Sequence, residues 1–93
     1  MVIQAGSVES IVVKVVDESG NIDTLPGGTT FSVFDADMEP VPGQQDIAAT
    51  VQGMDALCVV DTGITGVGDF DLFLSFTVGA ETPILGPHKF RVS

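Results

Sequence analysis

The clearest hydrophobic pattern in the chain is a strict alternation over residues 70–78. One side of this period-two repeat carries five apolar residues, Phe70, Leu72, Leu74, Phe76 and Val78. The residues between them are mostly polar, so the segment is predicted to be a β-strand with one buried face. Such a strand needs a second layer to cover its apolar side, and the rest of the chain offers further strands for that layer.

Shorter apolar runs predict these further strands, and Gly and Pro residues separate them. Residues 10–16 carry apolar side chains on both faces, so we expect this strand to lie in the centre of a sheet. Residues 40–42 read Pro-Val-Pro and indicate an edge or a loop, because proline cannot donate a hydrogen bond to a sheet. Other strands are expected at residues 22–25, 29–35, 47–52, 56–61 and 88–92.

No segment of the sequence predicts a helix. No window places apolar residues at the i, i+3, i+4 spacing over three turns. Residues 62–68 include Gly63, Gly66 and Gly68, which favour a loop. Residues 17–21 and 53–55 have the composition of tight turns.

These patterns together predict an all-β fold in one domain over residues 1–93. The best fit is a small immunoglobulin-like β-sandwich of about seven strands, although the paired cysteines, the tryptophan and the tyrosine of antibody domains are absent. The expected core consists of nine inward-facing residues, Val13, Val15, Phe31, Val33, Phe70, Leu72, Leu74, Phe76 and Phe90.

Charge restricts the partners of this fold. Thirteen Asp and Glu residues outnumber three cations, Lys14, Lys89 and Arg91, and the formal net charge is −10. Three cations are too few to follow a phosphate backbone, so nucleic acid is not an expected partner. A hydrophobic content of 44% favours a folded acidic surface over a disordered tail. Residues 1–6 lack the basic and apolar runs of a signal peptide or a membrane span, so no membrane partner is expected.

The residue chemistry gives little sign of catalysis. The single Cys58 has apolar neighbours and is predicted to be a core residue; it excludes an internal disulfide and suits a reducing cytoplasm. The single His88 belongs to no nucleophile motif. The glycines of residues 63–68 precede a strand, whereas a phosphate-binding loop opens a helix. We therefore expect no enzyme activity and no cofactor.

Two acidic groups are candidates for a metal site. Asp35, Asp37 and Glu39 alternate in a predicted loop, a spacing that can direct several oxygens at one calcium ion. They lack the glycine and the downstream glutamate of an EF-hand loop, so a solvated turn is the competing interpretation. A second group has the same two interpretations and consists of Asp17, Glu18, Asn21 and Asp23.

The order of the motifs resembles that of a known family. It runs through residues 12–21 (VVKVVDESGN), 25–35 (LPGGTTFSVFD), 40–41, 61–63, 68–76 (GDFDLFLSF) and 86–92 (GPHKFRV). The chain resembles the immunoglobulin-like domains of tailed-phage virion proteins and is similar to the N-terminal domain of siphophage upper baseplate proteins. It departs from the baseplate pattern because no helical or receptor-binding region follows.

The resemblance implies a non-enzymatic structural protein of a bacteriophage virion. Its place would be head decoration, neck or connector, tail or baseplate, and its partners would be other virion proteins after synthesis in the host cytoplasm. The alternative is an immunoglobulin-like module of a bacterial surface or adhesive protein, stabilised by calcium. A sugar-binding domain is disfavoured because the chain has no Trp or Tyr.

The N-terminal residues are candidates for a contact between subunits. Met1, Val2, Ile3 and Gln4 carry no charged side chain and precede Gly6. Because unpaired strand edges invite strand addition, we expect these residues or an exposed sheet edge to pair with a neighbouring subunit in a homo-oligomer or lattice.

Overall fold

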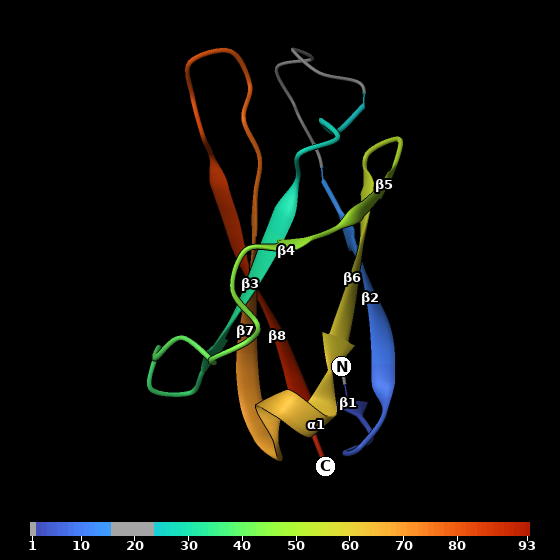
Figure 1. Ribbon diagram of the computed structural model, residues 1–93, viewed down its shortest axis with the longest axis vertical. Coiled ribbons are helices and arrows are strands. Elements are labelled where there is room, and N and C mark those ends of the chain that lie inside the picture. The colour runs from blue at the N-terminus through green and yellow to red at the C-terminus, as the bar shows by residue number, and fades with distance from the viewer. Residues whose placement is uncertain (1, 16–23) are drawn as a thin grey trace.

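The computed structural model describes residues 2–15 and 24–93, which form two β-sheets packed face to face (Figure 1). The predicted turn at residues 17–21 and the acidic group Asp17, Glu18, Asn21 and Asp23 lie outside these described residues. So does most of the strand predicted at residues 22–25.

The larger sheet has five strands. They are β1 (Val2–Ile3), β8 (Ile84–Val92), β7 (Gly68–Ser75), β3 (Thr30–Asp35) and β4 (Ile47–Ala48), in this spatial order. All neighbours in the sheet are antiparallel except β1, which runs parallel to β8. The register between β7 and β8 shifts at a bulge between Leu72 and Leu74.

The smaller sheet has three strands, β2 (Val8–Lys14), β6 (Asp55–Asp61) and β5 (Thr50–Gln52), in the order β2-β6-β5. In an immunoglobulin fold, strands B, E and D share one sheet and strands C, F and G the other. Here β2, β6 and β5 take the first set of positions, and β3, β7 and β8 take the second. The predicted small all-β sandwich is therefore confirmed.

The core lies between the two sheets. Eight of the nine predicted core residues are buried, and Val15 is partly buried against them. Cys58 is also fully buried, as its apolar neighbours predicted. The alternation is the reason for this agreement, because every second residue of β3 and β7 points toward the opposite sheet.

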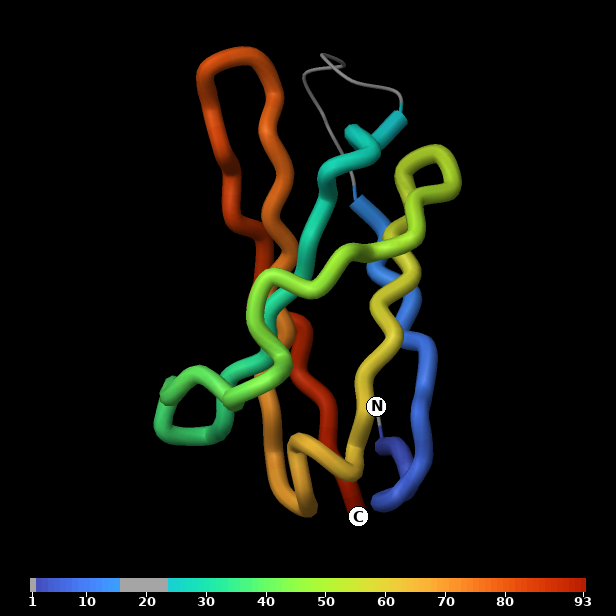
Figure 2. The backbone as a smooth tube through the Cα atoms, viewed as in Figure 1, coloured from blue at the N-terminus to red at the C-terminus, as the bar shows by residue number. Residues whose placement is uncertain are grey.

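The loop that joins β3 to β4 lies along the outer edge of β3, as Figure 2 shows. The Val41 amide donates to the Val33 carbonyl at 3.0 Å, and the Val33 amide donates to the Gln44 carbonyl at 2.9 Å. The prediction that residues 40–42 form an edge or a loop is confirmed. Within the described residues, no helix combines the length and the apolar character needed to cross a membrane.

Three local predictions were wrong. Residues 62–68 do not form a plain loop, because α1 (Thr62–Thr65) makes one helical turn there. The Asp61 carboxylate accepts a hydrogen bond from the Gly63 amide at 2.9 Å, and the Gly66 amide donates to the Thr62 carbonyl at 2.9 Å. These two caps are enough for a single turn, even though its glycine disfavours a longer helix.

The other two errors concern strands. Residues 10–16 were expected in the centre of a sheet, but among the described residues β2 is an edge strand and β6 is central. The second apolar face of β2 points to solvent, and Val12 is 52% exposed. Residues 47–52 do not form one strand, because the chain crosses from one sheet to the other between β4 and β5, at Ala49.

Candidate interaction surface on the five-stranded sheet

The outer face of the five-stranded sheet carries the side chains that alternate with the core. Because Phe70, Leu72 and Leu74 point inward, their neighbours along β7 point outward. The register places Asp69 opposite Arg91 and Asp71 opposite Lys89 on β8. The end of this face nearest α1 therefore carries two acid–base pairs.

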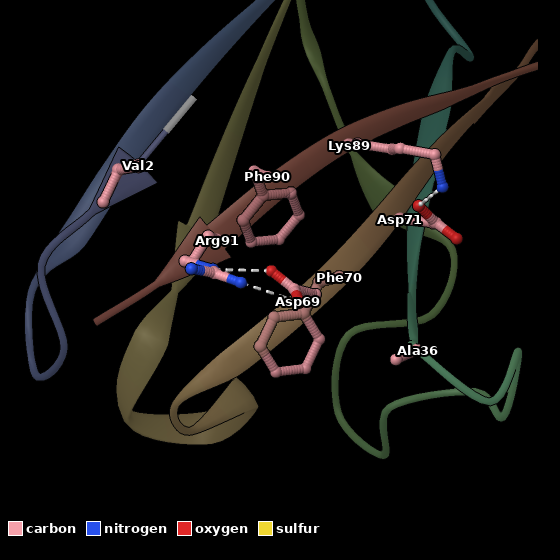
Figure 3. Close-up of a pocket in the computed structure, with 8 residues that line it drawn as sticks. All are labelled: Val2, Ala36, Asp69, Phe70, Asp71, Lys89, Phe90 and Arg91. Carbon is pink, nitrogen blue, oxygen red and sulfur yellow. Dashed lines mark hydrogen bonds and ion pairs between the residues drawn. The ribbon is translucent and has the colours of Figure 1, made fainter.

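Both pairs are formed by direct contacts (Figure 3). Arg91 binds Asp69 through two parallel hydrogen bonds, Nε to Oδ1 at 2.8 Å and Nη2 to Oδ2 at 3.2 Å. Lys89 Nζ donates to Asp71 Oδ1 at 3.1 Å. The hydrogen bond from Arg91 lowers the pKa of Asp69, and the same contact raises the pKa of Arg91. The Arg91–Asp69 pair is exposed, so its contribution to stability is small.

A shallow hollow of about 530 Å³ lies at these pairs. Its lining residues are Val2, Ala36, Asp69, Phe70, Asp71, Lys89, Phe90 and Arg91, and the rings of Phe70 and Phe90 stack with centroids 5.6 Å apart (Figure 3). The charged groups of the lining neutralise one another, and none of the lining residues is Ser, Cys or His. The hollow therefore holds no unpaired charge for a small ion and no Ser, Cys or His side chain.

A second hollow, of about 300 Å³, lies further along the same face. We call it the Phe34–Phe73 hollow; its lining residues are Ser32, Phe34, Met38, Asp46, Phe73, Ser75 and Ile84. The rings of Phe34 and Phe73 meet edge to face with centroids 5.4 Å apart. Ile84 is 69% exposed and Met38 is 52% exposed. Such a group of large exposed apolar side chains is typical of protein contact sites.

Gly86 allows one wall of this hollow to form. A Cβ atom at this position would lie 2.9 Å from the Leu72 carbonyl oxygen and 2.9 Å from Cδ1 of Phe73. The φ angle of Gly86 is +144°, which side chains other than glycine rarely allow. Glycine therefore lets β8 approach β7 closely where Phe73 projects from the bulge.

The structure does not bring the predicted calcium ligands together. Oδ1 of Asp35 accepts hydrogen bonds from the backbone amides of Asp37, at 2.9 Å, and Glu39, at 3.0 Å. The carboxylate of Asp35 thus stabilises its own turn, whereas Asp37 and Glu39 are exposed. In the described part of the chain, no three His, Cys, Asp or Glu side chains group as metal ligands.

The N-terminal residues proposed for a subunit contact pair with their own chain. Val2 and Ile3 lie beside Arg91 and Val92, and Ile3 is buried in the core. The Ser93 amide donates to the Ile3 carbonyl at 3.0 Å. Within the described residues, this segment therefore completes the sheet of its own subunit. Its participation in a contact between subunits stays a prediction.

Sequence reasoning missed the Phe34–Phe73 hollow, although two aromatic residues gave a signal. Phe34 and Phe73 occupy outward positions in strands whose inward positions are already apolar. An aromatic residue at such a position has no place in the core. Comparison of the chain with protein-family models, curated proteins and solved structures gives no match.

Proposed function

We propose that this protein is a non-enzymatic assembly protein that acts through contacts with other proteins, as a structural subunit of a bacteriophage virion. The observation that carries the protein-contact part of the proposal is the Phe34–Phe73 hollow. It presents two aromatic rings, a methionine and an isoleucine at the outer face of a sheet, away from the core. The virion part is supported by the resemblance of the motifs to immunoglobulin-like domains of tailed-phage proteins.

The distribution of chemical groups supports a binding role over a catalytic one. The larger hollow holds two neutralised acid–base pairs and no Ser, Cys or His side chain. Cys58 is fully buried and burial raises its pKa to about 11, so the thiol is neutral at physiological pH. This surface provides apolar contact area of a defined shape, and an assembly protein binds its partners through such area.

The test is the protein content of purified particles. The gene is first located; the proposal expects it among capsid or tail genes of a phage. Particles of that phage, purified by density gradient and washed with nuclease and high salt, should contain the chain when analysed by mass spectrometry. The proposal fails if the chain is absent from such particles. A gene that encodes a longer chain with a signal peptide would instead support the bacterial surface module.

A further inference from the structure

We infer that the Phe34–Phe73 hollow is the docking site for a partner protein that presents a bulky apolar side chain flanked by Lys or Arg. The inference rests on the proposed function in one respect, that the chain acts by contacting another protein. It adds which surface is used and what the partner's contact residues are.

The centre of the hollow selects an apolar anchor. The rings of Phe34 and Phe73 form two walls at a large angle, with an interplanar angle of 88°. Ile84 and Met38 supply flexible aliphatic groups at the margin and are largely exposed. An inserted apolar side chain would remove these groups from water, and the methionine can adapt to its shape. Anchors of this kind carry most of the binding energy in protein interfaces.

The margin of the hollow selects positive charge. Asp46 lines the hollow, and Asp37 and Glu39 are the exposed neighbours of Met38 in the loop after β3. Ser32 Oγ accepts a hydrogen bond from the Asp46 amide at 3.0 Å, which fixes the backbone of Asp46 beside the sheet. One carboxylate thus lines the apolar surface, and two more belong to the residues on either side of Met38 in the sequence.

Among residues 2–15 and 24–93, none of these carboxylates has a basic partner. All three Lys and Arg residues form their ion pairs elsewhere: Lys14 pairs with Asp55, Lys89 with Asp71, and Arg91 with Asp69. The formal net charge of −10 therefore rests on the other acidic residues, those beside the hollow included. A partner with Lys or Arg around its anchor supplies the missing charge, which directs its approach and orientation.

The same charges argue against a second copy as the occupant. In a second copy all three Lys and Arg side chains are already paired with carboxylates, and two chains of formal net charge −10 repel one another. Phosphate-bearing partners meet the same repulsion. The chemistry of the margin therefore points to a different, basic protein.

The experiment titrates ¹⁵N-labelled protein with short peptides and follows backbone amide shifts by NMR. The probe is acetyl-Lys-Thr-Phe-Thr-Lys-amide; one control replaces both Lys with Glu, and the other replaces Phe with Ser. We expect saturable shifts with the probe, localised at the hollow, and shifts about fivefold smaller with either control. Raising NaCl from about 0.05 to 0.5 M should weaken the probe's binding, because salt screens the acidic margin.

Two variants with a matched control locate the site. Ile84→Ser removes an exposed part of the hollow and should weaken binding about fivefold to tenfold. Asp37→Asn combined with Asp46→Asn should abolish the preference for Lys over Glu. Val67→Ser changes an apolar residue that is 72% exposed and lies outside the hollow, and it should leave binding unchanged.

Several results would overturn the inference. They are no saturable shift at the hollow, equal responses to the Lys and Glu peptides, or an Ile84→Ser protein that binds as the parent does. Sedimentation that shows a dimer broken by Ile84→Ser would assign the hollow to a second copy. If purified phage particles contain the protein and take up its Ile84→Ser variant normally, this inference fails while the proposed function stands.

Discussion

Replacing Phe76 by Ala tests the arrangement of the core. Phe76 follows β7 and continues its inward alternation, and it is 5% exposed. Removing a buried phenyl ring forfeits its transfer free energy and leaves a cavity, so the free energy of unfolding should fall by about 3–5 kcal/mol. In a domain of this size, each kcal/mol corresponds to about 4–8 °C in melting temperature. The melting temperature should therefore fall by at least about 12 °C.

The matched control is Phe73→Ala, which removes a phenyl ring from the outer face of β7. Phe73 is only partly buried and contacts Phe34, so its loss should cost about 1–2 kcal/mol. The assay is urea denaturation followed by circular dichroism, because the chain has no Trp or Tyr to report by fluorescence. The midpoint should move while the slope against urea stays constant.

One outcome needs a second variant. If the parent is stable by only about 5 kcal/mol, Phe76→Ala will be largely unfolded without urea. Phe76→Leu then provides the measurement, because leucine keeps most of the apolar volume and should cost less than alanine. The reasoning is refuted if Phe76→Ala costs no more than Phe73→Ala, since the inward and outward faces of β7 would then be wrongly assigned.

Three further predictions concern Gly86, Cys58 and the turn at Asp35. Gly86→Ala should destabilise the fold by about 1–3 kcal/mol in urea denaturation, because its φ of +144° and the nearby backbone leave no room for a Cβ, whereas Gly27→Ala, in open space, should be neutral or slightly stabilising. Burial raises the pKa of Cys58 from 9.0 to about 11, so between these pH values the folded state keeps a proton that the unfolded state has released. The free energy of unfolding, measured against pH, should therefore fall from pH 9.0 to about 11. This fall should be absent in Cys58→Ala. Millimolar calcium should leave the melting temperature unchanged, since Asp35 already binds its own backbone; a rise that Asp35→Asn with Asp37→Asn removes would restore the calcium hypothesis.

The alternation of apolar residues was enough to predict the layers and most of the core. In β3 and β7 the inward positions are Phe31 and Val33, and Leu72 and Leu74, and each is fully or almost fully buried. A one-residue slip would move all of them to solvent, so the pattern determines the face. This is why the sandwich could be predicted without a tertiary contact.

The wrong prediction for β2 arose because some of its apolar residues are exposed. In β2 both faces are apolar, yet Val12 faces solvent while Val13 is buried. Residue type alone cannot distinguish an exposed valine from one that a second sheet covers. The single turn of α1 depends on local caps at Asp61 and Gly66, which periodicity does not detect. The strand predicted at residues 47–52 is divided because its two parts, β4 and β5, belong to different sheets. The relative position of the sheets is a tertiary property that the residue pattern does not contain.

The Phe34–Phe73 hollow could not be predicted from the sequence for a related reason. Its apolar residues come from β3, the loop after it, β7 and β8, so no sequence window contains them together. Only the register of the sheet brings Phe34 and Phe73 into contact. The charges were visible in the sequence, but their pairing was not. The sequence shows three cations, and the structure shows that all three are already bound to carboxylates.

This pairing gives the outer face of the five-stranded sheet two unequal halves. Near α1 the charges of the Asp69–Arg91 and Asp71–Lys89 pairs cancel, whereas Asp46 lines the apolar half and makes it negative. At physiological ionic strength charges act over about 8 Å, so a basic partner is attracted to the apolar half at short range. Charge should then determine the rate at which the partner associates. The inserted apolar side chain should determine the rate at which the partner dissociates.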